Sequence, residues 1–115
     1  MATRKKKHTC IMPHKPIAKG RPRLGRRGRV FTPQRTLDAE AAIAAAWDGP
    51  KFDGPVKLKV VFHYDSMEVT VEKYPDGGSR LRGDVDNYLK TVMDGLNGIA
   101  WEDDKQVFAV EAEKT

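Results

Sequence analysis

The sequence predicts an α/β protein of the α+β kind, a small single domain with a mixed β-sheet and two main helices. Three observations predict it. The chain has 115 residues, 39% of them hydrophobic, which is enough for one compact core and too few for two. Apolar and polar residues alternate in segments 56–64 and 67–72, as they do in half-buried strands. Apolar residues recur with helical spacing in segments 33–47 and 85–96.

The N-terminal third is expected to hold short strands and a long loop. We assign residues 1–8 to a flexible basic tail and residues 9–115 to the folded domain. Thr9–Met12 is predicted to form a short strand, and Arg29–Phe31 another. Prolines and glycines recur over residues 13–28, so no long regular element is expected between these strands.

The helix predicted at about 33–47 has signals at both ends. Thr32 supplies a capping hydroxyl, and Pro33 follows where its missing N–H costs nothing. Asp48-Gly49-Pro50 ends the helix. Its apolar stripe consists of Leu37, Ala41, Ala44 and Trp47.

The remaining elements follow from periodicity. Segment 56–64 is a half-buried strand, and 67–72 is either a second strand or a continuation of it. The second helix, at about 85–96, places its apolar residues on one face: Val85, Leu89, Val92, Met93 and Leu96. Residues 107–113 are predicted to form a final strand.

Charge is distributed unevenly along the chain. Residues 1–35 carry twelve Lys or Arg and no acid, whereas residues 36–115 carry nine Lys or Arg against sixteen acids, a net charge of −7. A basic arm beside an acidic body is typical of a protein that meets a polyanion and also binds cations. The alternative is a solvated basic tail with ordinary surface acids.

Several classes of protein are disfavoured. Cys10 is the single cysteine, so neither an internal disulfide nor a zinc site of the usual spacing is expected. No apolar run approaches the ~18 residues of a membrane span. The basic N-terminus lacks the apolar segment of a secretory signal. We therefore expect a cytoplasmic protein with no membrane partner.

The strongest chemical signal is a set of acids around the second helix. Asp84 and Asp86 are separated by one residue, Lys90 follows one helical turn later, and Asp104 comes after a helix-length gap. Hydrolysis of a phosphodiester needs charge neutralisation and an activated water, and Mg²⁺ bound by carboxylates supplies both. Each feature also has a structural explanation: helix capping, an ordinary i,i+4 surface pair, and a solvated turn at 102–104.

At these residues the chain resembles the RusA family of Holliday junction resolvases. The matching motif reads Asp84-Val85-Asp86-Asn87, Lys90 and Asp94, then Trp101-Glu102-Asp103-Asp104-Lys105-Gln106-Val107. The N-terminal part is also similar, with Lys19-Gly20-Arg21-Pro22-Arg23 and Gly28-Arg29-Val30-Phe31-Thr32-Pro33. The resemblance covers about residues 9–113.

The resemblance implies a homodimer that nicks two opposed strands of a four-way DNA junction during recombination and repair, in a bacterial or phage-infected cell. It implies Mg²⁺, or Mn²⁺ in its place, as the cofactor. The metal ligands would be Asp84, Asp86 and Asp104, and the catalytic set would add Lys90. Asp94 and Asp103 would have supporting roles. Trp101 either packs or braces the loop that presents Asp104.

An acidic cluster repels a phosphate backbone, so basic residues elsewhere must position the DNA. The candidates are Lys19, Arg21, Arg23, Arg26, Arg27, Arg29, Arg80 and Arg82. The alternative is that several of them are merely solvated. Two rival functions remain open from the sequence: a nuclease of flaps, forks or other branched DNA, and a junction-binding protein without catalysis.

Overall fold

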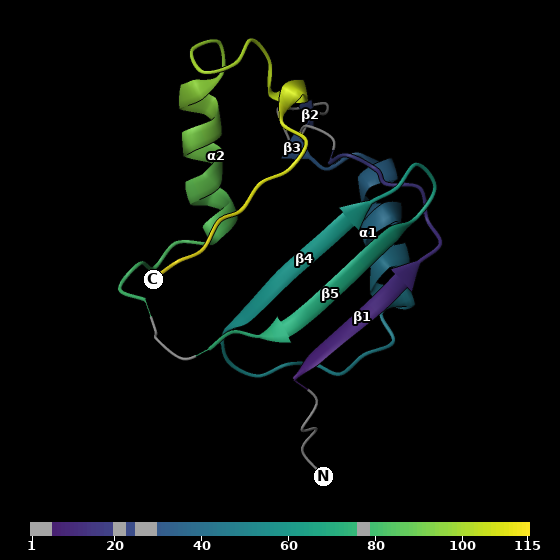
Figure 1. Ribbon diagram of the computed structural model, residues 1–115. Coiled ribbons are helices and arrows are strands. Elements are labelled where there is room, and N and C mark those ends of the chain that lie inside the picture. Colours follow the sequence, from purple (N-terminus) through teal and green to yellow (C-terminus); the bar gives the residue numbers. More distant parts are fainter. Residues whose placement is uncertain (1–5, 20–22, 25–29, 76–78) are drawn as a thin grey trace. The chain divides into compact units, whose positions relative to one another are not determined.

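The structure is a computed structural model, and it describes residues 6–19, 23–24, 30–75 and 79–115, with residues 23–24 and 30–31 described for their backbone only (Figure 1). The chain divides into two compact units, Met1–Pro75 and Asp76–Thr115. The first unit contains the sheet and one helix, and the second contains the other helix. The predicted α+β class is confirmed.

The sheet of the first unit has three strands in the order β1-β5-β4, with β1 at Lys7–Met12, β4 at Val56–Phe62 and β5 at Met67–Lys73. Both strand pairs are antiparallel, so the prediction of a mixed sheet was wrong. The reason is the short connection between β4 and β5, where the His63 N–H donates to the Ser66 carbonyl at 2.9 Å. A turn this tight joins only antiparallel neighbours. The two predicted strands in 56–72 are therefore separate strands of one hairpin.

Strand β1 begins earlier than predicted. Its first residue, Lys7, pairs with Glu72 of β5, and the Lys73 N–H donates to the Lys6 carbonyl at 2.8 Å. Opposite charges across neighbouring strands favour this pairing. Lys7 and His8 are thus part of the sheet, and the predicted tail boundary at residue 8 was wrong; residues 1–5 lie outside the described residues.

One face of the sheet carries the core. Cys10, Met12 and Met67 are at most 5% exposed and pack together with Ala46, Trp47 and Val69 around them. Helix α1, at Gln34–Ala46, lies against this face (Figure 1). The opposite face is polar, and on it the Thr9 and Thr70 hydroxyls are 2.9 Å apart. This division follows from the period-2 alternation of the strands.

Helix α1 matches the predicted segment to within a residue at each end. Its N-cap, however, is Pro33 rather than Thr32, and no side chain caps it. The main chain closes the first turn instead, because the Thr36 N–H donates to the Pro33 carbonyl at 3.0 Å. The prediction of a threonine cap was wrong by one residue, which is a common uncertainty at helix ends.

The C-terminal end of α1 is tied to β1. His8 Nε2 lies 2.6 Å from Asp48 Oδ1, and the His8 ring meets the Trp47 ring edge-on at a centroid distance of 5.1 Å. The Cys10 thiol donates to the Ala46 carbonyl at 3.3 Å, and desolvation by burial raises the pKa of this thiol. The hydrogen bond with His8 is the largest cause that lowers the pKa of Asp48.

Two short strands, β2 at Arg23–Leu24 and β3 at Val30–Phe31, pair antiparallel. The predicted strand at Arg29–Phe31 is confirmed for its last two residues, whereas Arg29 lies outside the described residues.

The second unit contains helix α2 at Val85–Leu96, with the bounds predicted, and a short 3-10 helix, η2, at Asp104–Gln106. Residues 107–113 form no regular element, so the predicted final strand was wrong. A segment becomes a strand only when a neighbouring strand supplies hydrogen bonds, and no described strand pairs with this one. None of the described helices is long and apolar enough to cross a membrane.

Candidate functional site

All the predicted acids of the site lie in the second unit. Asp84 is the N-cap of α2, Asp86 belongs to its first turn, and Asp94 to its last part. Asp103 and Asp104 stand at the start of η2. The predicted catalytic lysine, Lys90, is exposed in the middle of α2. The candidate site therefore rests on the start of α2 and on the η2 turn.

Asp84 caps α2 with its main chain and not with its side chain. Its carbonyl accepts from the N–H groups of Asn87 and Tyr88 at 3.1 and 3.2 Å, and its backbone is extended at φ −76° and ψ 144°. Its side chain makes no capping hydrogen bond. The carboxylate of a capping aspartate normally accepts a hydrogen bond from an N–H group of the first helical turn. Helix capping therefore does not explain the Asp84 side chain.

The i,i+4 surface pair is also not formed. Asp86 and Lys90 are both exposed, and none of the ion pairs in the described part of the chain involves either residue. Both groups are therefore available to a ligand. Helical spacing places Asp86, Lys90 and Asp94 on one face of α2.

Asp104 is held by an indole. Trp101 Nε1 donates to Asp104 Oδ1 at 2.8 Å, and both side chains are partly buried. Of the two roles considered for Trp101, bracing the loop that presents Asp104 is the one that the structure contains. A bond to one carboxylate oxygen orients the group and leaves the second oxygen for another partner.

Asp103 has a different task from its neighbour. Its side chain accepts from the Gln106 main-chain N–H, and its own N–H donates to Gln106 Oε1 at 3.1 Å, which together form a capping box. Its Oδ1 also accepts from the Lys105 N–H at 2.8 Å. The Glu102 N–H donates to the same Gln106 oxygen at 2.6 Å. Asp103 thus builds the turn that carries Asp104. The two adjacent aspartates, which look alike in the sequence, have separate surroundings.

The residue before the acidic pair is held at both of its main-chain polar groups. The Gly83 N–H donates to the Tyr88 hydroxyl at 3.0 Å, and the Gly83 carbonyl accepts from Lys114 Nζ at 3.1 Å. Sequence reasoning missed Tyr88 and Lys114. The only signal was that Tyr88 lies outside the apolar face of α2, which left its role open.

The predicted ligands are of the type that binds a hard divalent cation, but the described structure does not bring them together at one metal-binding position. Asp84, Asp86 and Asp104 offer carboxylate oxygens, the ligands that Mg²⁺ and Mn²⁺ prefer. Across the described residues, no group of three or more His, Cys, Asp or Glu side chains lies close enough to hold a metal ion. The three metal ligands therefore remain a prediction.

The basic residues proposed for DNA contact are described in part. Arg80 and Arg82 are exposed in the second unit, just before the acidic pair. Lys19 is exposed in the first unit, with its Nζ 3.9 Å from Glu40 Oε2. Arg23 lies in β2 with only its backbone described, and Arg21, Arg26, Arg27 and Arg29 lie outside the described residues.

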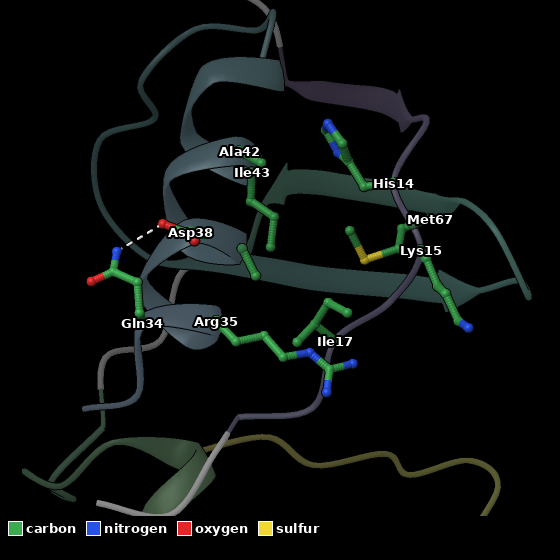
Figure 2. Close-up of a pocket in the computed structure, with 10 residues that line it drawn as sticks. His14, Lys15, Ile17, Gln34, Arg35, Asp38, Ala42, Ile43 and Met67 are labelled. Atoms are coloured by element: carbon green, nitrogen blue, oxygen red, sulfur yellow. Dashed lines mark hydrogen bonds between the residues drawn. The ribbon is translucent and has the colours of Figure 1, made fainter.

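A pocket of about 460 Å³ lies in the first unit between α1 and the segment after β1. Ile17, Ile43 and Met67 point toward one another across it, and His14 and Arg35 line its ends (Figure 2). His14 Nδ1 is buried without a hydrogen-bond partner among the described residues. No residue predicted for the site lines this pocket, so it is separate from the acidic set.

Comparison with known proteins relates the chain to a nuclease family. Residues 13–115 match the family model for the endodeoxyribonuclease RusA. The chain is also similar to a Bacillus subtilis (strain 168) protein named "Uncharacterized protein YqaN", with 33% identity over 115 residues that cover 86% of this chain and 80% of that protein. No solved structure gives a significant match. Since the family model spans nearly the whole chain, the protein belongs to the RusA endodeoxyribonuclease family.

Proposed function

We propose that the protein is a divalent-metal-dependent endonuclease that resolves four-way DNA junctions by paired nicks on opposed strands. The observation that carries the proposal is the pair Asp84 and Asp86 at the start of α2, whose carboxylates are not used for helix capping or ion pairing within the described part of the chain. In a member of the RusA family, carboxylates left available in this way suit the hydrolysis of a phosphodiester.

Each residue has a stated role in this proposal. Asp84, Asp86 and Asp104 would hold Mg²⁺ or Mn²⁺, and Trp101 would orient Asp104 through its hydrogen bond. When bound, the cation neutralises the phosphate and activates the attacking water. The Lys90 ammonium would stand beside the scissile phosphate and stabilise the negative charge that develops there. The products would be a 5′-phosphate and a 3′-hydroxyl.

DNA binding and assembly complete the proposal. Arg80 and Arg82 would contact phosphates near the acids, and the basic segment 19–29 would contact phosphates farther away. Two active sites are needed to cut two opposed strands, so we propose a homodimer. Its setting would be the cytoplasm of a bacterial or phage-infected cell, during DNA recombination and repair.

The test is the substitution Asp86→Asn. Removal of one ligand charge should abolish cleavage of a four-way junction and leave junction binding intact, because phosphate contacts supply most of the affinity. Asp53→Asn, an exposed aspartate in a loop of the first unit, is the matched control and should cut like the parent. If Asp86→Asn cuts as fast as the parent, the site assignment is wrong.

The substrate is tested separately. Cleavage of a mobile four-way junction, a fork and a linear duplex should be compared, each with Mg²⁺ and with a chelator. The proposal expects paired nicks on the junction that need the cation. Preferential cutting of the fork would replace junction resolution with the broader activity on branched DNA, and junction binding without any nicking would point to a non-catalytic protein.

A further inference from the structure

The peptide that leads into the acidic pair is fixed by two side chains from outside its own loop. Gly83 directly precedes Asp84. Its N–H donates to the Tyr88 hydroxyl at 3.0 Å, and its carbonyl accepts from Lys114 Nζ at 3.1 Å. Both main-chain polar groups of one residue are thus held by side chains. We call this arrangement, formed by Gly83, Tyr88 and Lys114, the Gly83 clamp.

The Tyr88 half of the clamp comes from α2 itself. Tyr88 lies one helical turn after Asp84, and its side chain reaches back over the N-terminal end of the helix. The fit is close: a Cβ added to Gly83 would lie 2.9 Å from two atoms of the Tyr88 phenol. A side chain at position 83 would therefore require the Tyr88 phenol to move.

The Lys114 half comes from a segment far along the chain. Residues 107–115 form no regular element, yet the partly buried Lys114 reaches the carbonyl of Gly83. Asp104 and η2 come directly before this segment, and Asp104 is ten residues before Lys114. The lysine thus links the segment that follows Asp104 to the segment that presents Asp84.

We propose that Tyr88 and Lys114 are positioning residues for the Asp84 carboxylate. This inference rests on the proposed function, in which Asp84 is a metal ligand. Asp84 has an extended backbone and no side-chain capping bond, so the orientation of its carboxylate depends on the peptide that joins it to Gly83. A ligand group must be held to within ~0.5 Å of its working geometry. The clamp restrains the peptide that sets this geometry.

Two substitutions release the clamp one half at a time. Tyr88→Phe keeps the ring and removes the acceptor of the Gly83 N–H, and Lys114→Met keeps most of the side-chain length and removes the donor. Loss of an outer partner of a metal ligand typically weakens metal affinity by about 10–100-fold. We expect that loss in Mn²⁺ affinity and a comparable fall in kcat, with the junction Kd unchanged. Lys114→Arg restores a donor, so it should recover most of the Mn²⁺ affinity and most of the kcat.

The readouts separate positioning from general stability. Mn²⁺ binding to the DNA-free protein is followed by electron paramagnetic resonance, junction binding is measured in Ca²⁺, and the Tm of each variant is recorded. The exchange rate of the Gly83 amide proton gives a readout that does not depend on activity, and it should rise in Tyr88→Phe. Tyr64→Phe and Lys51→Met, exposed residues of the first unit, are the matched controls.

The outcomes are distinct. In the first outcome the parent cuts junctions and binds Mn²⁺, and Tyr88→Phe and Lys114→Met have the same cleavage rate and Mn²⁺ affinity as the parent. The Gly83 clamp then has no positioning role, and the proposed function stands. A drop in Tm that accounts for the whole loss of activity, with Mn²⁺ affinity unchanged, also overturns the inference. If the parent itself neither cuts nor binds Mn²⁺, the proposed function fails and the inference fails with it.

Discussion

The indole N–H of Trp101 donates a hydrogen bond to one carboxylate oxygen of Asp104, at an Nε1–Oδ1 distance of 2.8 Å. The two residues are three apart, and the Trp101 carbonyl also accepts from the Gly98 N–H at 2.6 Å, which holds the Trp101 main chain just after the end of α2. Gly98 takes φ +82°, a conformation that favours glycine. A rigid donor therefore orients an aspartate that belongs to the proposed ligand set.

Replacement of Trp101 by Phe is expected to impair the site more than the fold. The variant keeps an aromatic ring and loses the donor, so Asp104 gains rotational freedom. We expect Mn²⁺ affinity and cleavage to fall by about 10-fold or more, while the free energy of unfolding falls by only about 1 kcal/mol, the usual net worth of one hydrogen bond. Metal titration and urea unfolding measure the two effects.

A second indole provides the control for this experiment. Trp47 Nε1 donates to the Pro50 carbonyl at 3.1 Å in the first unit, which contains none of the predicted acids. Trp47→Phe should reduce stability by a similar amount and leave metal affinity unchanged. Equal losses of metal affinity in both variants would contradict an orienting role for Trp101.

The neighbouring aspartates Asp103 and Asp104 should respond in opposite ways. Asp103→Ala removes the capping box of η2 and should cost about 1 kcal/mol of stability, within the usual range for a lost N-cap. The Asp103→Ala variant should retain much of the parent's rate of junction cleavage. Asp104→Asn should barely change the unfolding free energy and should abolish Mg²⁺-dependent cleavage. Urea melts and single-turnover cleavage of a labelled junction give both quantities. The assignment is wrong if Asp103→Ala is inactive and Asp104→Asn is active.

Acid should weaken the attachment of α1 to β1. Hydrogen bonding, first to His8 and then to Cys10, holds the pKa of Asp48 below its ordinary value of 3.8. A carboxyl with a lowered pKa in the folded state stabilises the fold above its unfolded pKa and loses that contribution as the pH falls through the folded pKa. Stability should therefore decline below about pH 4 in the parent, and this part of the decline should be missing in Asp48→Asn. Urea unfolding from pH 7 to pH 2 measures the free energy of unfolding of both proteins. A parallel decline in the parent and in Asp48→Asn would exclude a contribution of Asp48 to the acid sensitivity.

The salt dependence of junction binding should report on Arg80 and Arg82. If each arginine contacts one phosphate, the slope of log K against log salt should fall by about 0.9 for each residue replaced by alanine. The loss of affinity should be similar on junctions of different sequence, because phosphate contacts carry no base information. Fluorescence anisotropy in Ca²⁺ at several salt concentrations measures the slope, with Lys51→Ala as the control. An unchanged slope in the double variant would remove these residues from the interface.

The local sequence was sufficient for several elements. Periodicity and end signals predicted α2 with its observed bounds and α1 to within a residue, and alternation predicted extended structure over 56–64 and 67–72, which became β4 and β5. These features depend on residues within one or two turns of each other, so a short window of sequence contains the cause. The acids at the start of α2 and their motif were visible for the same reason.

Other features were settled by contacts between residues distant in the chain. The strand order β1-β5-β4 depends on pairing across more than fifty residues, and residues 107–113, which were predicted to form a strand, have no described partner strand. The sequence by itself determined the acidic motif of the proposed site and its position at the start of α2. Only the folded structure decided between local alternatives, with Asp103 capping a turn and Trp101 bracing Asp104, and only its long-range contacts brought Lys114 to the Gly83 carbonyl 31 residues away. The physical reason is that hydrogen bonds between side chains need a specific distance and direction, and only the folded chain provides them.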